Sequence, residues 1–161
     1  LNSNAASNFW KPQTVFDRIP GGSTMAGFLY GLDKEFVEAL GEVEVKTVLH
    51  PFDRVNGATF DITYDKVYLA SRKDIYGTDE FSGMSEGTQL EYYQGTGNAE
   101  KIKYQNGTAR YWWLRTPSSS TASDVRGVGT DGSLGGNGAS GSRGVVPACS
   151  ICGKATIEVA E

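Results

Sequence analysis

The sequence lacks the features that mark proteins of nucleic acids and membranes. Its 15 Lys and Arg residues are outnumbered by 19 Asp and Glu, for a net charge of −4, and no basic run stands out. Binding to nucleic acid needs a clustered basic face. No segment approaches the ~20 apolar residues of a membrane span, and none has the pattern of a signal peptide. We therefore expect no nucleic-acid partner and no membrane insertion, and the first residue, Leu1, suggests a fragment or processed product.

Histidine and cysteine are almost absent, which argues against catalysis and metal binding. The one histidine, His50, has no GxSxG-type nucleophile motif nearby. Cys149 and Cys152 form a single CxxC, whereas a zinc site wants four ligands and a thioredoxin-like motif wants the start of a helix. A spacing of three in a strand puts the two thiols on opposite faces. We expect buried structural thiols without a disulfide, no metal, no cofactor and no enzymatic activity.

Aromatic residues are missing from the whole chain after Trp113. Residues 117–144 are mainly Ser, Gly, Thr and Ala, with four charged residues: Asp124, Arg126, Asp131 and Arg143. Such a composition alone would indicate a flexible linker. Because the run lies between apolar Trp112–Leu114 and apolar Val145–Ala148, we interpret it as ordered surface loops and hairpins held by a packed body.

The 161 residues fit one domain, and 21 glycines, about twice the usual ~7%, indicate many turns. Two short helices are predicted: one capped by Asp33 that stops at Gly41, and one that starts with a capping box at Ser71 and Asp74 and ends at Gly77. Alternating, β-branched or aromatic segments predict strands at Val43–Val48, in Thr59–Ala70 (one or two strands), and at Ala109–Thr116, Asp124–Gly129, Arg143–Ile151 and Ala155–Val159. The fold class is therefore α+β, with two early helices, a mostly antiparallel sheet and long loops.

Two further segments are predicted to be irregular. Residues 1–14 form an arm whose Phe9 and Trp10 dock on the body. Residues 78–107 form a long polar loop, in which Tyr92, Tyr93 and Tyr104 either contact a ligand or fasten the loop to the core. The strand at Ala109–Thr116 is apolar on both faces, so we expect it to be an interior strand with Trp112, Trp113 and Leu114 in the core.

The ending of the sequence resembles a known family. Trp112-Trp113-Leu114-Arg115-Thr116-Pro117, then Asp131-Gly132, then Gly144-Val145-Val146-Pro147-Ala148, is similar to the end segment of C-type-lectin-like domains of phage and prophage proteins. These include the variable proteins of diversity-generating retroelements. The upstream pieces FDRIP…GLDKEF and KVYLASRKDIYG also resemble phage-encoded proteins with this ending. One departure is Val146, which stands where Arg is frequent.

The resemblance implies a single C-type-lectin-like domain over residues 1–161, with residues 117–144 as a displayed, variable-type region. In retroelement-diversified members, Asn codons become Ser, Gly, Thr, Asp or Ala codons, and this run has that character. Any Gly/Ser-rich loop would look the same, so diversification stays a hypothesis. Calcium-dependent sugar binding is not implied, because the EPN, QPN and WND signatures are missing.

The leading hypothesis is a ligand-recognition module, of receptor-binding or adhesin type, on a phage virion or bacterial cell surface. Its partner would be a host-surface or other macromolecular ligand, and the domain would be a homo-oligomer or part of a larger virion or surface protein. Small polar side chains belong at the surface, so the expected ligand-binding residues are Ser118, Ser119, Ser120, Thr121, Ser123, Arg126, Thr130, Asp131, Ser133, Gly135, Gly136, Asn137, Ser140, Ser142 and Arg143.

Three alternatives stay open. Arg126 and Arg143 either bind the ligand or merely pair with Asp124 or Asp131. The domain could instead be a structural virion decoration or tail-fibre component without a ligand of its own. An oxidase related to the formylglycine-generating enzymes, which share a related fold and use cysteines, is the third; Cys149 and Cys152, however, belong to the strand that follows the displayed loops.

Overall fold

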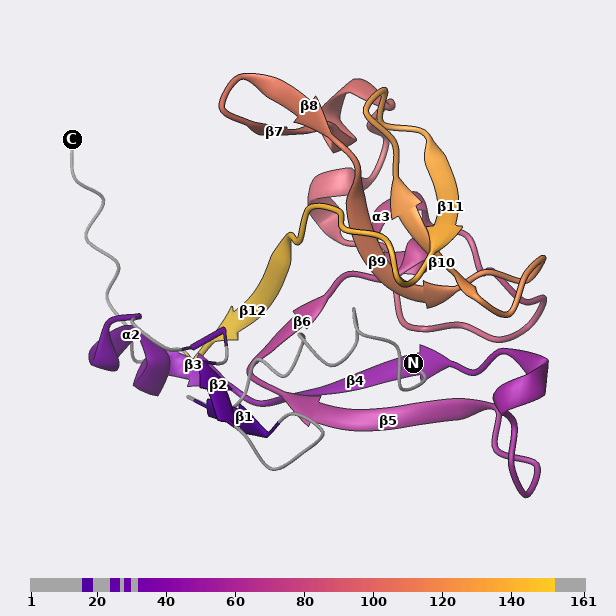
Figure 1. The fold of residues 1–161 in the computed structure, drawn as a ribbon, viewed down its shortest axis with the longest axis horizontal. Helices are drawn as coiled ribbons and strands as arrows, with labels where there is room; N and C mark the ends of the chain where they lie inside the picture. Colours follow the sequence, from indigo (N-terminus) through magenta and orange to yellow (C-terminus); the bar gives the residue numbers. More distant parts are fainter. Residues whose placement is uncertain (1–15, 19–23, 27, 30–31, 153–161) are drawn as a thin grey trace.

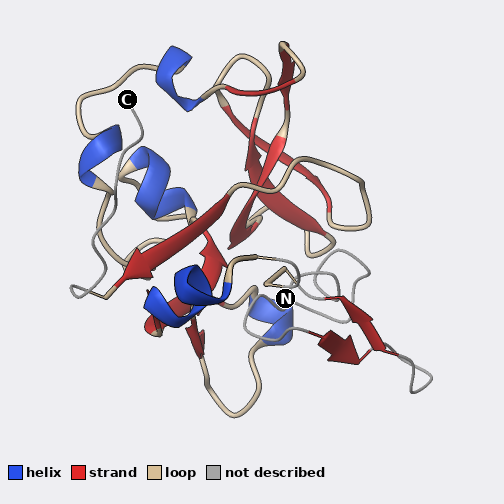
Figure 2. Cartoon of the chain, turned by 90° about the vertical axis from the view of Figure 1, so that its left-hand side faces the viewer, coloured by secondary structure: helices blue, strands red, loops and turns tan. Residues whose placement is uncertain are grey.

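The computed structural model describes residues 16–18, 24–26, 28–29 and 32–152. The expectations for the arm at residues 1–14 and the strand at Ala155–Val159 lie outside these residues. The described part is an α+β domain with few short helices and mostly antiparallel strands (Figure 1). Loops and single helical turns connect many of its strands (Figure 2).

The first elements of the described chain are two short strands, one short helix and a third short strand. Strand β1 (Phe16–Arg18) pairs antiparallel with β2 (Thr24–Ala26). Helix α2 (Lys34–Ala39) starts at the predicted cap, where the Asp33 carboxylate accepts the N–H groups of the next turn. It ends before the predicted stop, because the chain becomes extended as β3 (Leu40–Gly41) and pairs with a late strand.

The middle of the chain follows the predicted pattern closely. Strand β4 (Val43–Val48) pairs antiparallel with β5 (Phe60–Asp65) along their full lengths, and β6 (Val67–Leu69) follows. A 3₁₀ turn, η1 (Pro51–Asp53), lies between β4 and β5. Helix α3 (Arg72–Tyr76) has the predicted capping box and ends at Gly77, whose φ of 71° is in the left-handed region.

The predicted loop at residues 78–107 is more structured than expected. It contains two 3₁₀ turns, η2 (Glu91–Tyr93) and η3 (Ala99–Lys101), and ends in β7 (Lys103–Gln105). Strand β7 pairs antiparallel with β8 (Thr108–Arg110) across an Asn106–Gly107 turn with φ values of 52° and 74°. Positive φ at both turn residues suits a tight hairpin and explains the Asn-Gly pair.

The Ser/Gly-rich run forms ordered structure. Strand β9 (Trp112–Pro117) pairs with β10 (Asp124–Val128), which pairs with β11 (Leu134–Gly138), so residues 117–144 contribute two strands as well as loops. Strand β12 (Pro147–Ile151) lies between β6 and β3. It begins four residues later than predicted, since residues 143–146 pair with β9 through a single bridge, between Trp112 and Gly144, and not as a strand.

Strand β9 separates two apolar clusters, as predicted from its two-sided sequence. Trp112 and Leu114 pack with Ala70, Ile75, Tyr93 and Val128, while Trp113 packs with Leu69, Val125 and Ala139. Trp112, Trp113 and Leu114 are all buried, which confirms their place in the core. The strand lies at an edge of its sheet, not in the interior. Its second side is covered by other backbone: the Arg115 N–H donates to Ala70 O and the Trp113 N–H to Gly144 O.

Candidate functional site

The predicted binding residues lie on the β10–β11 hairpin and its flanking segments, residues 118–123 and 140–143. Both segments meet at the open end of the hairpin, where the Ser118 N–H donates to Asp124 O and the Ala139 N–H to Ser123 O, each at 2.9 Å. Residues 130–133 lie at the other end, in the turn between the strands. We call this whole surface the display face. Ten of its fifteen predicted residues are exposed: Ser119, Ser120, Thr121, Ser123, Thr130, Asp131, Gly136, Ser140, Ser142 and Arg143.

Ser118 does not belong to the exposed set. Its side chain is buried, with 1% of the residue exposed, and its Oγ lies 2.9 Å from the Oγ of Ser120. The reason is local: Ser118 follows β9 directly and its backbone is tied to the start of β10. The prediction that Ser118 displays its side chain to a ligand is therefore wrong.

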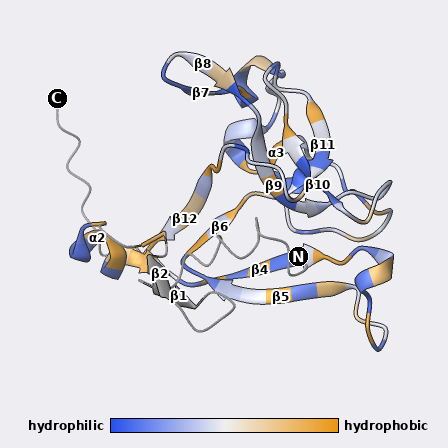
Figure 3. Ribbon diagram, in the orientation of Figure 1, coloured by the Kyte–Doolittle hydropathy of each residue, from blue (hydrophilic) through white to orange (hydrophobic). Residues whose placement is uncertain are grey.

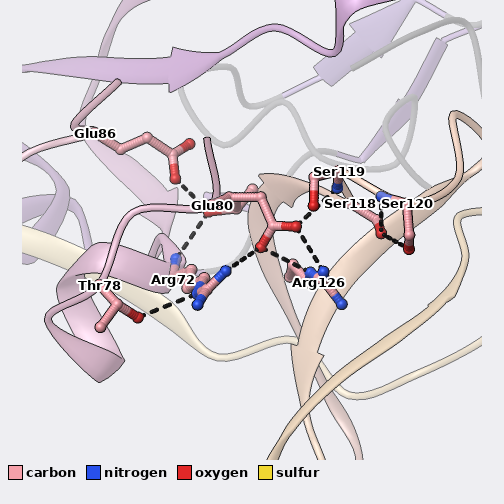
Figure 4. Close-up of polar contacts among 9 residues, drawn as sticks. Arg72, Thr78, Glu80, Glu86, Ser118, Ser119, Ser120 and Arg126 are labelled. Atoms are coloured by element: carbon pink, nitrogen blue, oxygen red, sulfur yellow. Dashed lines mark hydrogen bonds and ion pairs between the residues drawn. The ribbon is translucent and has the colours of Figure 1, made fainter. Parts of the chain in front are cut away.

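Arg126 is an anchor of the display face. Its partner is neither Asp124 nor Asp131: the guanidinium binds Glu80, with Nε 2.8 Å from Oε2 and Nη2 2.6 Å from Oε1 (Figure 4). This two-pronged geometry is the strong form of an arginine–carboxylate contact. Sequence reasoning missed it because Glu80 is 46 residues away, in a segment predicted as loop.

The Glu80 carboxylate accepts further hydrogen bonds. Arg72 Nη1 donates to Oε2 at 2.6 Å, and the Ser119 N–H donates to Oε1 at 2.7 Å (Figure 4). Burial alone would raise the pKa of Glu80, but the hydrogen bonds from Arg126, Ser119 and Arg72 lower the pKa to about 2. Glu80 is thus a buried anion that joins α3, the following loop and the display face.

A second polar network involves Arg115 and Thr116 of the WWLRTP segment itself. Arg115 is buried; its Nη1 donates to Asp74 Oδ2 at 2.7 Å and its Nη2 to Glu86 O at 3.0 Å. Thr116 donates its hydroxyl to the Glu86 carboxylate, and burial raises the pKa of that carboxyl. Arg115 and Thr116 therefore hold loops to β9 and are not available to a ligand.

Gly135 lies against the ring of Tyr111. It pairs with Gly127 across the hairpin, and the Tyr111 ring lies against both residues. A Cβ placed on Gly135 would lie 3.1 Å from Tyr111 Cε2, and one on Gly127 only 2.3 Å from Cε1. Glycine is favoured at Gly127 because the ring occupies the space of a side chain, while at Gly135 a side chain would require the ring to shift by a few tenths of an ångström. Gly135, an expected ligand-binding residue, therefore also contributes to packing.

Arg143 and Asp131 keep separate partners. Arg143 is exposed; Nη2 donates to Asn137 Oδ1 at 3.1 Å, Nη1 to Ser142 O at 3.0 Å, and the guanidinium lies 5.6 Å from the Tyr111 ring centre. Asp131 accepts from the Ser133 hydroxyl and N–H, which lower its pKa. The considered pairing of Arg143 with an aspartate is therefore also wrong.

A groove of about 910 Å³ adjoins the display face. It lies between the β7–β8 hairpin and the segment 142–146, with Thr130, Asn137, Ser142 and Arg143 of the predicted set on its wall. The hairpin adds residues that the sequence did not single out: Lys103, Gln105, Ala109 and Arg110. Figure 3 shows that this hairpin is largely hydrophilic.

The hairpin also supplies aromatic groups that the run after Trp113 lacks. Tyr104 and Tyr111 both line the groove, and Tyr104 is 66% exposed. Among the loop tyrosines, Tyr93 is buried in the core and fastens the loop, while Tyr92 is 69% exposed. Fastening the loop to the core is thus shown for Tyr93, while the rings of Tyr92 and Tyr104 are exposed. The Asn106–Gly107 turn was the sequence signal that could have placed Tyr104 on a hairpin.

The two cysteines lie on β12 and directly after it. Cys149 and Cys152 are free and exposed, so the expectation of buried thiols is wrong; alternate residues of β12 face solvent, and Cys149 is one of them. Within the described ranges, no group of three or more His, Cys, Asp or Glu is placed to hold a metal ion. The same ranges contain no helix long and apolar enough to cross a membrane.

Comparison with known proteins assigns a family. The profile of the family described as "Domain of unknown function (DUF6273)" matches residues 1–153, so the chain belongs to this family. No curated protein and no solved structure gives a significant match. Family membership by itself names no ligand and no reaction.

Proposed function

We propose that this DUF6273 domain is a ligand-recognition module of a phage virion or bacterial surface, with a C-type-lectin-like fold and the display face as its binding surface. The observation that carries the proposal is that different residues hold the hairpin in position and form its exposed surface. The backbone of the display face is fixed by buried groups such as Glu80 and Trp112, while many of its own side chains are exposed.

Several exposed side chains of the display face have no role in holding the fold. Thr121, Ser140 and Ser142 donate or accept no side-chain hydrogen bond within the described part of the chain. Thr121 and Ser140 flank the hydrogen bond between the Ser123 carbonyl and the Ala139 N–H, at the open end of the hairpin. Substitution there changes the surface without removing a contact, which is what a variable recognition surface requires.

The chemistry of the display face and groove suits recognition. Ser, Thr and Asn offer adaptable hydrogen bonds, Arg143 offers a planar guanidinium, and Tyr104 offers a rigid exposed ring. The side chains of the display face are small, so each contact area is small. Binding is therefore expected to be modest per domain and to gain from several copies.

The experiment compares two matched pairs of substitutions. The test variant is Thr121→Gln with Ser140→Gln; the control is Thr88→Gln with Ser82→Gln, also exposed but in the loop before η2. Fluorescent streptavidin tetramers of each biotinylated chain are added to a panel of fixed Gram-negative and Gram-positive cells and measured by flow cytometry. We expect the wild type and control to bind at least one strain, and the test variant to bind it at least tenfold less at an unchanged Tm.

Two outcomes contradict this proposal. Equal binding by test and control variants would remove the display face from recognition. Absence of binding to every strain, with all three chains folded, would favour the structural virion component.

A further inference from the structure

The groove beside the display face is lined by positively charged side chains and by no negatively charged ones. Its lining contains three cations, Lys103, Arg110 and Arg143, and neither aspartate nor glutamate. The chain as a whole has a net charge of −4. The positive lining is therefore a local feature that runs against the overall charge, and such a cleft concentrates anions.

Two of these cations occupy opposite positions on neighbouring strands. Lys103 and Arg110 are register partners on β7 and β8. Like charges directly opposite on an antiparallel pair are destabilising. Within the described residues, neither forms an ion pair; the Lys103 ammonium lies 6.0 and 5.9 Å from the ring centres of Tyr92 and Tyr93. The fold therefore keeps an unfavourable pair that an external anion would relieve.

The third cation is similarly left without a carboxylate. Arg143 bonds to an amide oxygen and a backbone carbonyl, both neutral. By contrast, Arg72, Arg115 and Arg126 each contact a buried or half-buried carboxylate. These three arginines are thus paired with carboxylates, and the two arginines of the groove are not; Arg54, outside the groove, also has neutral partners, Leu49 O and Met84 Sδ.

The remaining lining indicates the kind of anion. Gln105, Thr130, Asn137 and Ser142 provide amides and hydroxyls, and Tyr104 provides an exposed ring. Val145 is the one largely exposed aliphatic side chain among the lining residues. A protein partner usually meets an apolar centre free of charged residues, whereas here the apolar groups, Tyr104, Tyr111 and Val145, share the groove with three cations. Hydroxyl-rich ligands with acidic groups fit the lining better.

We propose that the groove binds a carboxylate-bearing polysaccharide, whose acidic groups pair with Lys103, Arg110 and Arg143 and whose hydroxyls bond to the neutral polar residues. The inference rests on the proposed function, since it names the ligand class of the same surface. The competing explanation is that charges on β7 and β8 only protect exposed strand edges from pairing with other chains. That explanation predicts no binding.

The experiment uses a charge reversal whose effects on folding and binding go in opposite directions. Arg110→Glu turns the repulsive cross-strand pair with Lys103 into an attractive one, so the Tm should hold or rise. Polygalacturonate is immobilised for biolayer interferometry with the full chain, and affinity should fall at least tenfold in the variant. Wild-type affinity should also weaken as salt rises from ~50 to ~300 mM, because salt screens exposed charges. Lys34→Glu, with the same change in net charge on exposed α2, is the control and should bind as wild type.

The other probes separate the alternatives. Dextran tests for a neutral glycan, poly-L-glutamate for an acidic protein, and oligothymidylate for nucleic acid; equal or tighter binding of any of these overturns the inference. Unchanged binding of Arg110→Glu to polygalacturonate, or no binding by the wild type, overturns it as well. If cell binding still depends on Thr121 and Ser140 in that case, the proposed function survives and only the ligand class fails.

Discussion

Glu80 and Arg126 form a two-pronged ion pair between a loop and the middle of β10, with N–O distances of 2.8 and 2.6 Å. The Glu80 side chain is fully buried, while that of Arg126 keeps 20% of its surface exposed. The display face is therefore held in position by Glu80, a buried residue that does not belong to it. This arrangement lets exposed residues vary while the hairpin keeps its position.

Removing the charge of Glu80 should destabilise the domain. Glu80→Gln leaves Arg126 and Arg72 without their carboxylate, and breaking a buried pair from one side costs about 3–5 kcal/mol. Because both arginines are about one-fifth exposed, we expect a smaller loss, about 2–4 kcal/mol, by urea unfolding. Glu38→Gln breaks the exposed pair with Lys34 and should cost less than about 0.5 kcal/mol. Equal effects of the two substitutions would show that Glu80 is not an anchor.

The free energy of unfolding should fall at acid pH as Glu80 becomes protonated. Its pKa falls from 4.5 to about 2 on folding, so its contribution is complete above 4.5 and is lost as pH drops toward 2. Glu86 acts in the opposite direction, because burial raises its pKa and protonation relieves the cost. We expect Glu80→Gln to lose less stability than wild type between pH 5 and pH 3, measured by urea midpoints. A parallel loss in both proteins would contradict the assigned role.

Much of the fold was predictable because its signals are local. The capping box of Ser71 and Asp74, the Gly77 stop and the alternation of β4 all appear where the sequence placed them. Trp112 and Leu114 were recognised as core residues because the strand is apolar on both sides. Each of these features depends on residues within a few positions of one another.

The errors concern contacts between distant segments. Ser118 is small and polar, yet burial follows from its position after β9. The true partner of Arg126 lies in a region that composition marks only as loop. Gly135 looks like a free loop residue, but Tyr111 packs on it. Such contacts are set by how segments meet in space, so no pattern within one segment shows them.

Two tyrosines offer a matched test of hydroxyl bonding. The Tyr111 hydroxyl is buried and has no hydrogen-bond partner among the described residues, whereas the Tyr76 hydroxyl donates to Gly132 O at 2.8 Å. Leaving a buried polar group unpaired costs about 1–3 kcal/mol. Tyr111→Phe should therefore keep or raise the free energy of unfolding, and Tyr76→Phe should lower it by about 1 kcal/mol. A clear loss for Tyr111→Phe, by urea unfolding, would reveal a partner for that hydroxyl.

The two hairpin glycines that contact the Tyr111 ring should tolerate a side chain poorly, most of all Gly127. In Gly127→Ala the new Cβ would lie 2.3 Å from Tyr111 Cε1, closer than such atoms approach, so the ring must move. Overpacking of this kind typically costs about 1–3 kcal/mol. Gly138→Ala is the control on the facing strand, because its Cβ meets only the Ser140 Oγ, at 4.0 Å, and should stay within about 0.5 kcal/mol. In a Tyr111→Ala background the obstructing ring is gone, and Gly127→Ala should then cost much less than in the wild type. The coupling between the two substitutions, measured as a double-mutant cycle by urea unfolding, isolates the contact. Additive losses would show that Gly127 is required for another reason.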